Sequence, residues 1–86
     1  MPFRIMEQGI EAVRQGNKIE GARLLKIALN NDQLQGSLRA TAYLWLSETK
    51  TDIKSKIDCH RRALDAEPNN ENIRSRLARL LELDLP

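Results

Sequence analysis

The sequence is poor in the residues that carry most protein chemistry. Its 86 residues include one cysteine, one histidine and 3% aromatic residues, namely Phe3, Tyr43 and Trp45. A single cysteine excludes an internal disulfide and is consistent with a reducing compartment. A zinc site needs three or four ligands, and Cys59 and His60 are adjacent, so they point about 100° apart on a helix. We therefore expect a half-buried thiol, a packed imidazole and no metal site.

Catalytic motifs are absent as well. The single histidine is the only imidazole base, and neither a serine motif nor a glycine elbow accompanies it. The four glycines do not form a phosphate-binding loop, because such a loop follows a strand and no segment alternates as a strand does. We expect a protein that is not an enzyme and that uses no cofactor, no metal and no small-molecule substrate.

Long apolar runs are also missing. The longest covers residues 42–46, whereas a helix that crosses a membrane needs about 20 apolar residues. The first residues lack the apolar stretch of a signal peptide, so we expect a cytoplasmic protein with no membrane contact. Charged residues make up 30% of the chain and nearly cancel, at a net charge of +2. Opposite charges recur three and four residues apart, which is typical of a solvated helix face.

What the sequence does contain is helical periodicity, with apolar residues at steps of three and four. Five such segments lie at about residues 2–15, 18–30, 37–49, 53–68 and 70–83. Gly16 ends the first segment, Ser37 is expected to cap the third, Asp52 the fourth, and Asn69 or Asn70 the fifth. The sequence predicts an all-α domain whose helices are joined by short turns.

Three packing features are expected. Residues 37–49 are apolar on all sides, so this helix needs neighbours on two sides. Gly9 and Gly21 lie in the first two helices, where the lack of a side chain allows the helix axes to cross closely. The inward stripe of the second helix is expected to consist of Ile19, Ala22, Leu25 and Leu29, with a second inner row of Leu24 and Ala28.

Two segments of the chain are similar to each other in sequence. Residues 24–33 align with residues 59–68 at an offset of 35, and both segments contain an alanine-leucine pair shortly before a turn. A period near 34 residues, made of helix, turn and helix, is typical of the tetratricopeptide repeat.

The residues that resemble the signature of this repeat occur in both units. In the second unit they are Trp45, Leu46, Ala63, Leu64, Pro68, Asn69 and Asn70, and in the first Gly9, Gly16, Gly21, Leu25, Ala28 and Leu29. Residues 42–52 followed by 59–70 resemble, more narrowly, a degenerate bacterial variety that carries a Trp-Leu pair before a shortened turn. The chain departs from the repeat at Gln33, Lys56 and His60, where proline, a small residue and a large apolar residue are usual.

The resemblance implies a right-handed α-α superhelix (TPR-like) that forms one domain over residues 1–86. It implies two helix-turn-helix repeats, at about residues 3–33 and 37–68, and a C-terminal solvating helix at about residues 70–83. Repeats of this family are similar in using the first helix of each pair to line a concave groove. The expected function is therefore that of a protein-protein interaction module or scaffold, which binds a peptide or a partner domain through its concave face.

Four residues of the third helix are the candidate partner-binding residues: Arg39, Tyr43, Ser47 and Lys50. Tyr43 offers contact area and a hydroxyl at a low cost in entropy, and packing against the last helix is an equally good explanation for a tyrosine here. Arg39 and Lys50 flank it and suit an acidic residue or a chain-end carboxylate.

Two alternative functions remain open. Leu83 and Leu85 lie off the inner stripe of the last helix, which makes that helix a candidate surface for self-association as a homodimer. Nucleic-acid binding is less favoured, because acidic residues interleave with the basic ones. The arginines that it would use are Arg61, Arg62, Arg74, Arg76 and Arg79.

Overall fold

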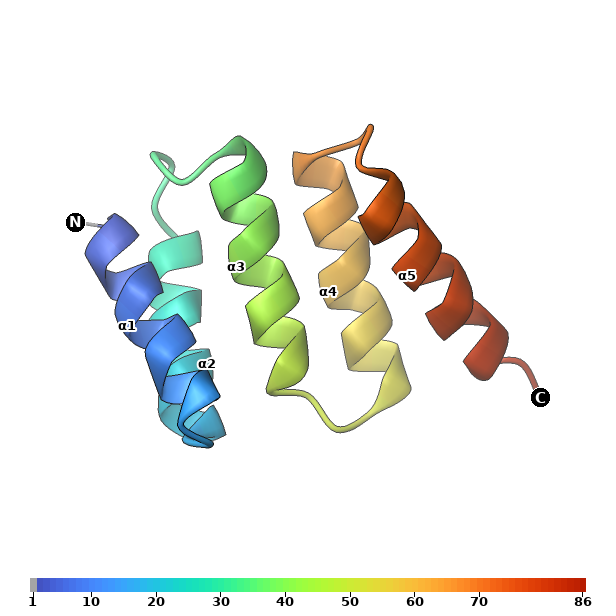
Figure 1. The fold of residues 1–86 in the computed structure, drawn as a ribbon, viewed down its shortest axis with the longest axis horizontal. Coiled ribbons are helices and arrows are strands. Elements are labelled where there is room, and N and C mark those ends of the chain that lie inside the picture. Colours follow the sequence, from blue (N-terminus) through green and yellow to red (C-terminus); the bar gives the residue numbers. More distant parts are fainter. Residues whose placement is uncertain (1) are drawn as a thin grey trace.

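The computed structural model describes residues 2–86, and all regular structure in that range is helical. The five helices are α1 (Pro2–Arg14), α2 (Lys18–Leu29), α3 (Gly36–Glu48), α4 (Ile53–Ala66) and α5 (Glu71–Leu83). Figure 1 shows α1 and α2 paired at one end, followed by α3, α4 and α5 side by side, with the two chain termini at opposite ends. The predicted all-α architecture and its five helices are confirmed.

Three helices begin at a polar residue that caps their first turn. Asn17, Asp52 and Asn70 precede α2, α4 and α5, and each side chain accepts a hydrogen bond from the backbone N–H three residues later, at 3.4, 3.0 and 3.0 Å. Each cap satisfies an N–H that has no partner inside the helix. The predicted caps at Asp52 and Asn70 are confirmed.

The predicted cap at Ser37 is wrong. Helix α3 begins one residue earlier, at Gly36, and Gln35 before it makes no side-chain capping bond. Gly36 has a φ of +60°, a left-handed conformation that glycine adopts without steric cost. The backbone conformation of a glycine therefore starts this helix, instead of a serine side chain.

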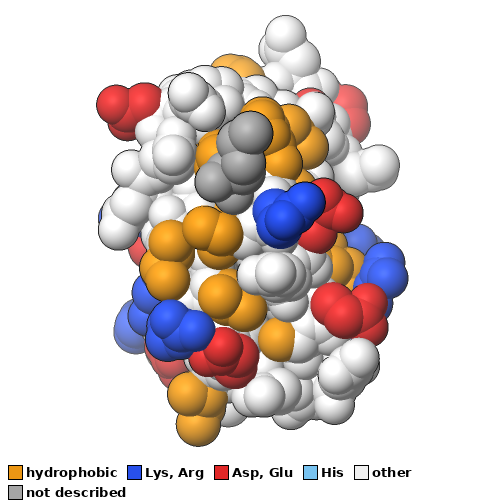
Figure 2. Space-filling view, turned by 90° about the vertical axis from the view of Figure 1, so that its left-hand side faces the viewer, with side chains coloured by type: hydrophobic (Ala, Val, Ile, Leu, Met, Phe, Trp, Pro, Cys, Tyr) orange, Lys and Arg blue, Asp and Glu red, His pale blue; other side chains and the backbone are white. Residues whose placement is uncertain are grey.

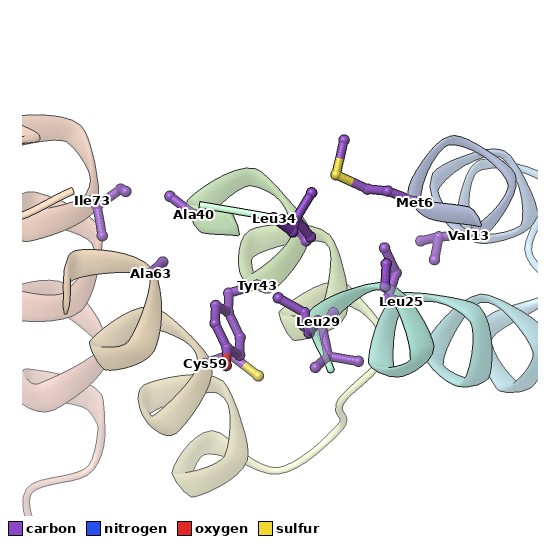
Figure 3. Packing of buried hydrophobic residues seen from close by; sticks show 13 residues of the cluster. Met6, Val13, Leu25, Leu29, Leu34, Ala40, Tyr43, Cys59, Ala63 and Ile73 are labelled. Atoms are coloured by element: carbon purple, nitrogen blue, oxygen red, sulfur yellow. The ribbon is translucent and has the colours of Figure 1, made fainter. Parts of the chain in front are cut away.

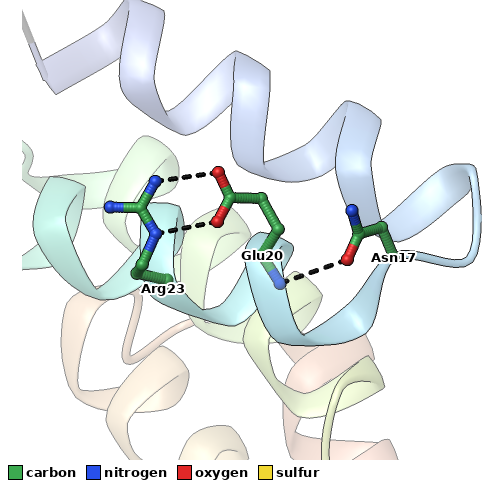
Figure 4. A network of polar contacts seen from close by, with 3 residues as sticks. All are labelled: Asn17, Glu20 and Arg23. Carbon is green, nitrogen blue, oxygen red and sulfur yellow. Dashed lines mark hydrogen bonds and ion pairs between the residues drawn. The ribbon is translucent and has the colours of Figure 1, made fainter.

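An ion pair joins the first and second turns of α2, as Figure 4 shows. Arg23 donates from Nε and Nη2 to the two carboxylate oxygens of Glu20, at 2.7 and 2.8 Å. These hydrogen bonds lower the pKa of Glu20 below its usual range. Because both side chains are exposed to solvent, the pair adds little to stability. It does neutralise a carboxylate on the solvent-exposed side of α2.

Helices α1 and α2 cross where two glycines face each other. A Cβ atom at Gly21 would lie 2.5 Å from Val13 Cγ2 and 3.1 Å from the backbone oxygen of Gly9. A Cβ atom at Gly9 would lie 2.9 Å from Leu25 Cγ. Atoms do not approach this closely without displacement, so the expected close crossing at Gly9 and Gly21 is confirmed.

The core is centred on α3, which packs between α2 and α4 and also contacts α1. Figure 3 shows the buried side chains as a continuous row from Met6 and Val13 of α1 to Ile73 of α5. The buried residues of α3 point in several directions, and they are Ala40, Ala42, Tyr43, Leu46 and Ser47. The expectation that this helix needs neighbours on two sides is confirmed.

The predicted inward stripe of α2 is wrong at Ile19, which is 88% exposed. The contact of α2 with the rest of the molecule is centred on Gly21, Leu25 and Ala28, all of which are buried. Ile19 lies two residues before Gly21 and therefore about 200° away around the helix. Its side chain points to solvent for that reason.

Apolar side chains remain exposed at both ends of the molecule. Figure 2 looks onto the α1–α2 end, where hydrophobic side chains gather between charged ones. Helix α5, at the other end, has one fully buried residue, Ile73. Among the helices in residues 2–86, only α4 has Cα atoms within 8 Å of those of α5. Leu81, Leu83 and Leu85 are exposed there.

No helix in residues 2–86 has both the length and the apolar character needed to cross a membrane.

We predict that Gly21→Ala lowers the free energy of unfolding by roughly 1–3 kcal/mol, even though alanine favours a helix over glycine by about 1 kcal/mol. The new methyl group has to displace the β-branched Val13 and the backbone of α1. Thermal unfolding followed by circular dichroism measures the effect. In combination with Val13→Ala, the loss should be smaller than the sum of the two single losses. An unchanged midpoint for Gly21→Ala would contradict the close crossing.

Candidate functional site

A groove runs between α2 and α4, with α3 as its floor. Its central hollow has a volume of about 670 Å³. Four side chains that are each less than a tenth exposed form the apolar floor: Leu29, Tyr43, Leu46 and Cys59. Figure 3 shows the Tyr43 ring beside Cys59 of α4.

The walls of this hollow are basic. The basic side chains that line it are Lys26, Arg39, Lys50, Lys54 and Arg62. Asp58 is the acidic residue among the lining side chains. The chain as a whole is nearly neutral, so this excess of positive charge is a local property of the hollow.

Two smaller hollows extend the central one at its ends. The first, of about 520 Å³, shares Lys26 and Lys50 with it and adds Lys18 and Arg23. The second, of about 260 Å³, shares Arg39, Tyr43 and Arg62 and adds Asp65. The three hollows share lining residues and form one elongated surface, which we call the basic groove.

Hydrogen bonds of Arg39 connect the floor of this groove to the end of α2. Its Nη1 donates to the carbonyl oxygens of Leu29, at 3.0 Å, and Leu34, at 3.3 Å. Leu29 is the last residue of α2, so the guanidinium lies at the negative end of that helix. Its Nη2 donates to the Tyr43 hydroxyl at 3.4 Å, and its Cζ lies 5.4 Å from the centre of the Tyr43 ring. Arg39 therefore holds Tyr43 in place at the floor.

Some cations of the groove are paired and others are not. Arg62 pairs with Asp58 at 3.0 Å, and this hydrogen bond raises the pKa of Arg62. Lys54 pairs with Asp84 at 3.3 Å. Within residues 2–86, no carboxylate lies within 4.0 Å of three other cations of the groove, Lys18, Lys26 and Lys50. These three ammonium groups are available to an anionic partner.

The structure brings together three of the four residues proposed from the sequence. Arg39, Tyr43 and Lys50 line the central hollow. Tyr43 is 8% exposed, so only a small part of its side chain is accessible in the groove. Tyr43 belongs to the buried core, as the packing alternative expected, but it lies beside α2 and α4 and not against the last helix. Ser47 is 3% exposed and lies on another side of α3, with its Oγ 3.4 Å from His60 Nδ1.

The groove also contains residues that the sequence argument missed. Lys18, Lys26 and Arg62 come from α2 and α4, the second helices of the two predicted repeats, whereas the first helices were expected to line the binding surface. A signal was present in the sequence, because Lys18 and Lys26 are eight residues apart and lie on one stripe of a helix. Their position opposite α4 depends on the packing of the helices.

Cys59 and His60 lie on different faces of α4, as their adjacency in a helix requires. Cys59 forms part of the groove floor, and His60 lines a separate hollow near α5. Within the described residues, no group of three or more His, Cys, Asp or Glu side chains is placed to hold a metal ion.

The Cys59 thiol is expected to be unreactive. Burial raises the pKa of this thiol, the charge of Lys50 opposes the shift, and that of Asp58 adds to it. At pH 7 we predict that the folded chain reacts with dithionitrobenzoate more than about tenfold slower than the chain unfolded in guanidinium chloride. The absorbance of the released thionitrobenzoate measures both rates. Equal rates would show that Cys59 is accessible in the folded protein.

The fold and this surface define an all-α protein of five helices, in residues 2–86, with a basic groove on one face. No protein-family model, no curated protein and no solved structure matches the chain. The relation to the tetratricopeptide repeat therefore stays a prediction from the sequence.

Proposed function

We propose that this protein is an interaction module that binds an acidic peptide segment of a partner protein in the basic groove. The observation that carries this proposal is the set of unpaired lysines, Lys18, Lys26 and Lys50, along an elongated surface with an apolar floor. Acidic side chains pair with these ammonium groups, and apolar side chains cover the floor. The role is non-catalytic.

The shape of the groove favours a peptide over a compact ligand. Its three connected hollows extend from Lys18 on α2 to Asp65 on α4. Ile19 and Ile27 line the first hollow and are 88% and 43% exposed, so they offer an apolar contact beside the lysines. An acidic segment with one or two apolar residues therefore matches the groove better than a uniformly acidic one.

The helices are consistent with the proposed TPR-like superhelix of two repeats and a solvating helix. We propose, however, that the partner binds to the side of α2 and α4, because the connected basic hollows lie there. The single buried cysteine suits the reducing cytoplasm, which is the proposed compartment.

The arginines considered for nucleic-acid binding do not gather on one surface. Arg62 lines the basic groove and pairs with Asp58, whereas Arg76 and Arg79 line a hollow near α5. Arg74 pairs with Glu71 at 3.1 Å. A phosphate backbone needs a continuous row of available cations, and these arginines do not form one.

Fluorescence polarisation with a labelled peptide, in which glutamates and leucines recur at helical spacing, tests the proposal. We predict that Lys26→Ala with Lys50→Ala weakens binding by roughly tenfold, as expected for the loss of two charge pairs at or near the surface. The matched control is Arg4→Ala with Arg61→Ala, which removes two exposed basic side chains outside the groove. This control should keep the affinity of the original chain.

Three results would contradict the proposed function. The first is the absence of binding to the acidic peptide. The second is equal binding of a peptide in which glutamine replaces every glutamate, since the lysines would then contribute nothing. The third is an equal loss of affinity in both double variants, because a general attraction by net charge would explain it.

Self-association through α5 is the second candidate function, supported by the exposure of Leu83 and Leu85, at 68% and 71%. We predict that the average mass in sedimentation equilibrium rises with concentration, and that Leu85→Glu reduces this rise because it places a charge in the contact. A mass that stays at that of the monomer up to millimolar concentration would eliminate this candidate.

A further inference from the structure

A separate hollow, which is not part of the basic groove, lies on the opposite face of α4 from that groove. It has a volume of about 190 Å³ and is lined by side chains of α3, α4 and α5, so we call it the α5 hollow. Lys56 and His60 of α4 line it, whereas Asp58 and Arg62 line the groove. Residues two apart point about 200° away from each other on a helix, and residues four apart share a side. The two sites are therefore separate.

His60 supplies a buried polar group to the α5 hollow. The residue is 8% exposed, and its Nδ1 lies 2.8 Å from the carbonyl oxygen of Lys56. A carbonyl oxygen only accepts, so Nδ1 donates and the neutral ring has Nε2 as an acceptor. In residues 2–86, Nε2 makes no hydrogen bond. Every fully buried side-chain nitrogen or oxygen in that range has a hydrogen-bond partner, so Nε2 is not fully buried and is in contact with solvent. The hollow thus contains an available acceptor.

Three cations and one carboxylate also line the α5 hollow. The cations are Lys56 of α4 and Arg76 and Arg79 of α5, and the carboxylate is that of Glu48 of α3. Lys56 Nζ donates to the backbone oxygen of Ser47 at 3.4 Å. In the described part of the chain, none of the three cations has a carboxylate within 4.0 Å. Unpaired guanidiniums next to a carboxylate complement a ligand that carries both charges.

Two leucines of α5 complete the lining. Leu80 follows Arg76 by one turn and Leu83 follows Arg79 by one turn, so each arginine has an apolar neighbour on the same side of the helix. Leu83 is 68% exposed, and a ligand that covers it removes apolar surface from water. The hollow is smaller than the roughly 300–1,000 Å³ of sites for drug-sized molecules, and this size suits one amino acid.

We propose that the α5 hollow binds a free aliphatic amino acid such as leucine. Its carboxylate is bound by Arg76 and Arg79. Its ammonium group donates to Glu48 and to His60 Nε2, and its side chain packs against the two leucines of α5. The ligand carboxylate thus faces the cations of the lining and its ammonium group faces the one carboxylate, and binding does not depend on a peptide in the basic groove.

An NMR titration of the full chain tests this site. The ¹⁵N-labelled protein is titrated with L-leucine while the imidazole nitrogens of His60, the only histidine in the sequence, are observed. We expect a saturable shift of the Nε2 resonance, with a Kd below about 1 mM. Leucinamide lacks the carboxylate, 4-methylpentanoate lacks the ammonium group and glycine lacks the side chain. Each should bind at least about tenfold more weakly than leucine.

Variants assign the ligand to the proposed residues. Arg76→Ala with Arg79→Ala should remove the saturable shift, and thermal melting verifies that this pair of exposed substitutions leaves the fold intact. Glu48→Gln should reduce the affinity for leucine to that for 4-methylpentanoate. The variants Arg4→Ala with Arg61→Ala, and Lys26→Ala with Lys50→Ala, should bind leucine unchanged. The last result separates this site from the basic groove.

Two kinds of result would overturn the proposal. One is the absence of a saturable shift up to about 10 mM leucine, or shifts of the same size and midpoint for leucine and its three analogues. The other is an unchanged affinity for leucine in the folded double variant of Arg76 and Arg79.

Discussion

The enclosure of α3 between two other helices is the constraint on which both surfaces of this protein depend. Helix α3 packs against α2 on one side and α4 on the other, and its Ala42 is fully buried, as is Ala63 of α4. Small residues at these contacts allow the helix backbones to approach each other. Residues on other sides of α3 line two different hollows: Tyr43 and Leu46 line the basic groove, and Ser47 and Glu48 line the α5 hollow. The basic groove and the α5 hollow are therefore two consequences of one packing arrangement.

The electrostatic character of the groove arises from where the acidic residues point, since the chain has a net charge of only +2. Glu20 is engaged by Arg23 within α2, and Asp58 by Arg62 within α4. In each of these pairs an arginine neutralises a carboxylate that lies three or four residues away in the same helix. Lysines from two other places in the chain, Lys26 and Lys50, then face the same groove without such partners. A nearly neutral protein thereby acquires a basic groove.

Much of the fold followed from local interactions that a sequence displays directly. The caps at Asp52 and Asn70 each join a side chain to the N–H three residues later, and the close crossing at Gly9 and Gly21 follows from the absence of Cβ atoms. The candidate site was harder to predict. The sequence identified Arg39, Tyr43 and Lys50 because their spacing places them on one side of the predicted third helix, although Lys50 follows the end of α3 at Glu48. It offered no means of finding which other helices face that side.

Periodicity, caps and glycine positions were thus sufficient to establish five helices in residues 2–86 and the crossing of the first two, because each depends on residues within a turn or on a missing side chain. The rotation of each helix about its axis was decided only by tertiary packing. Successive side chains point about 100° apart around a helix. The packing of a helix against its neighbours therefore decides which of its side chains meet those of another helix. That is why Ile19 points to solvent, Ser47 turns to His60, and Lys26 joins Lys50 across the groove.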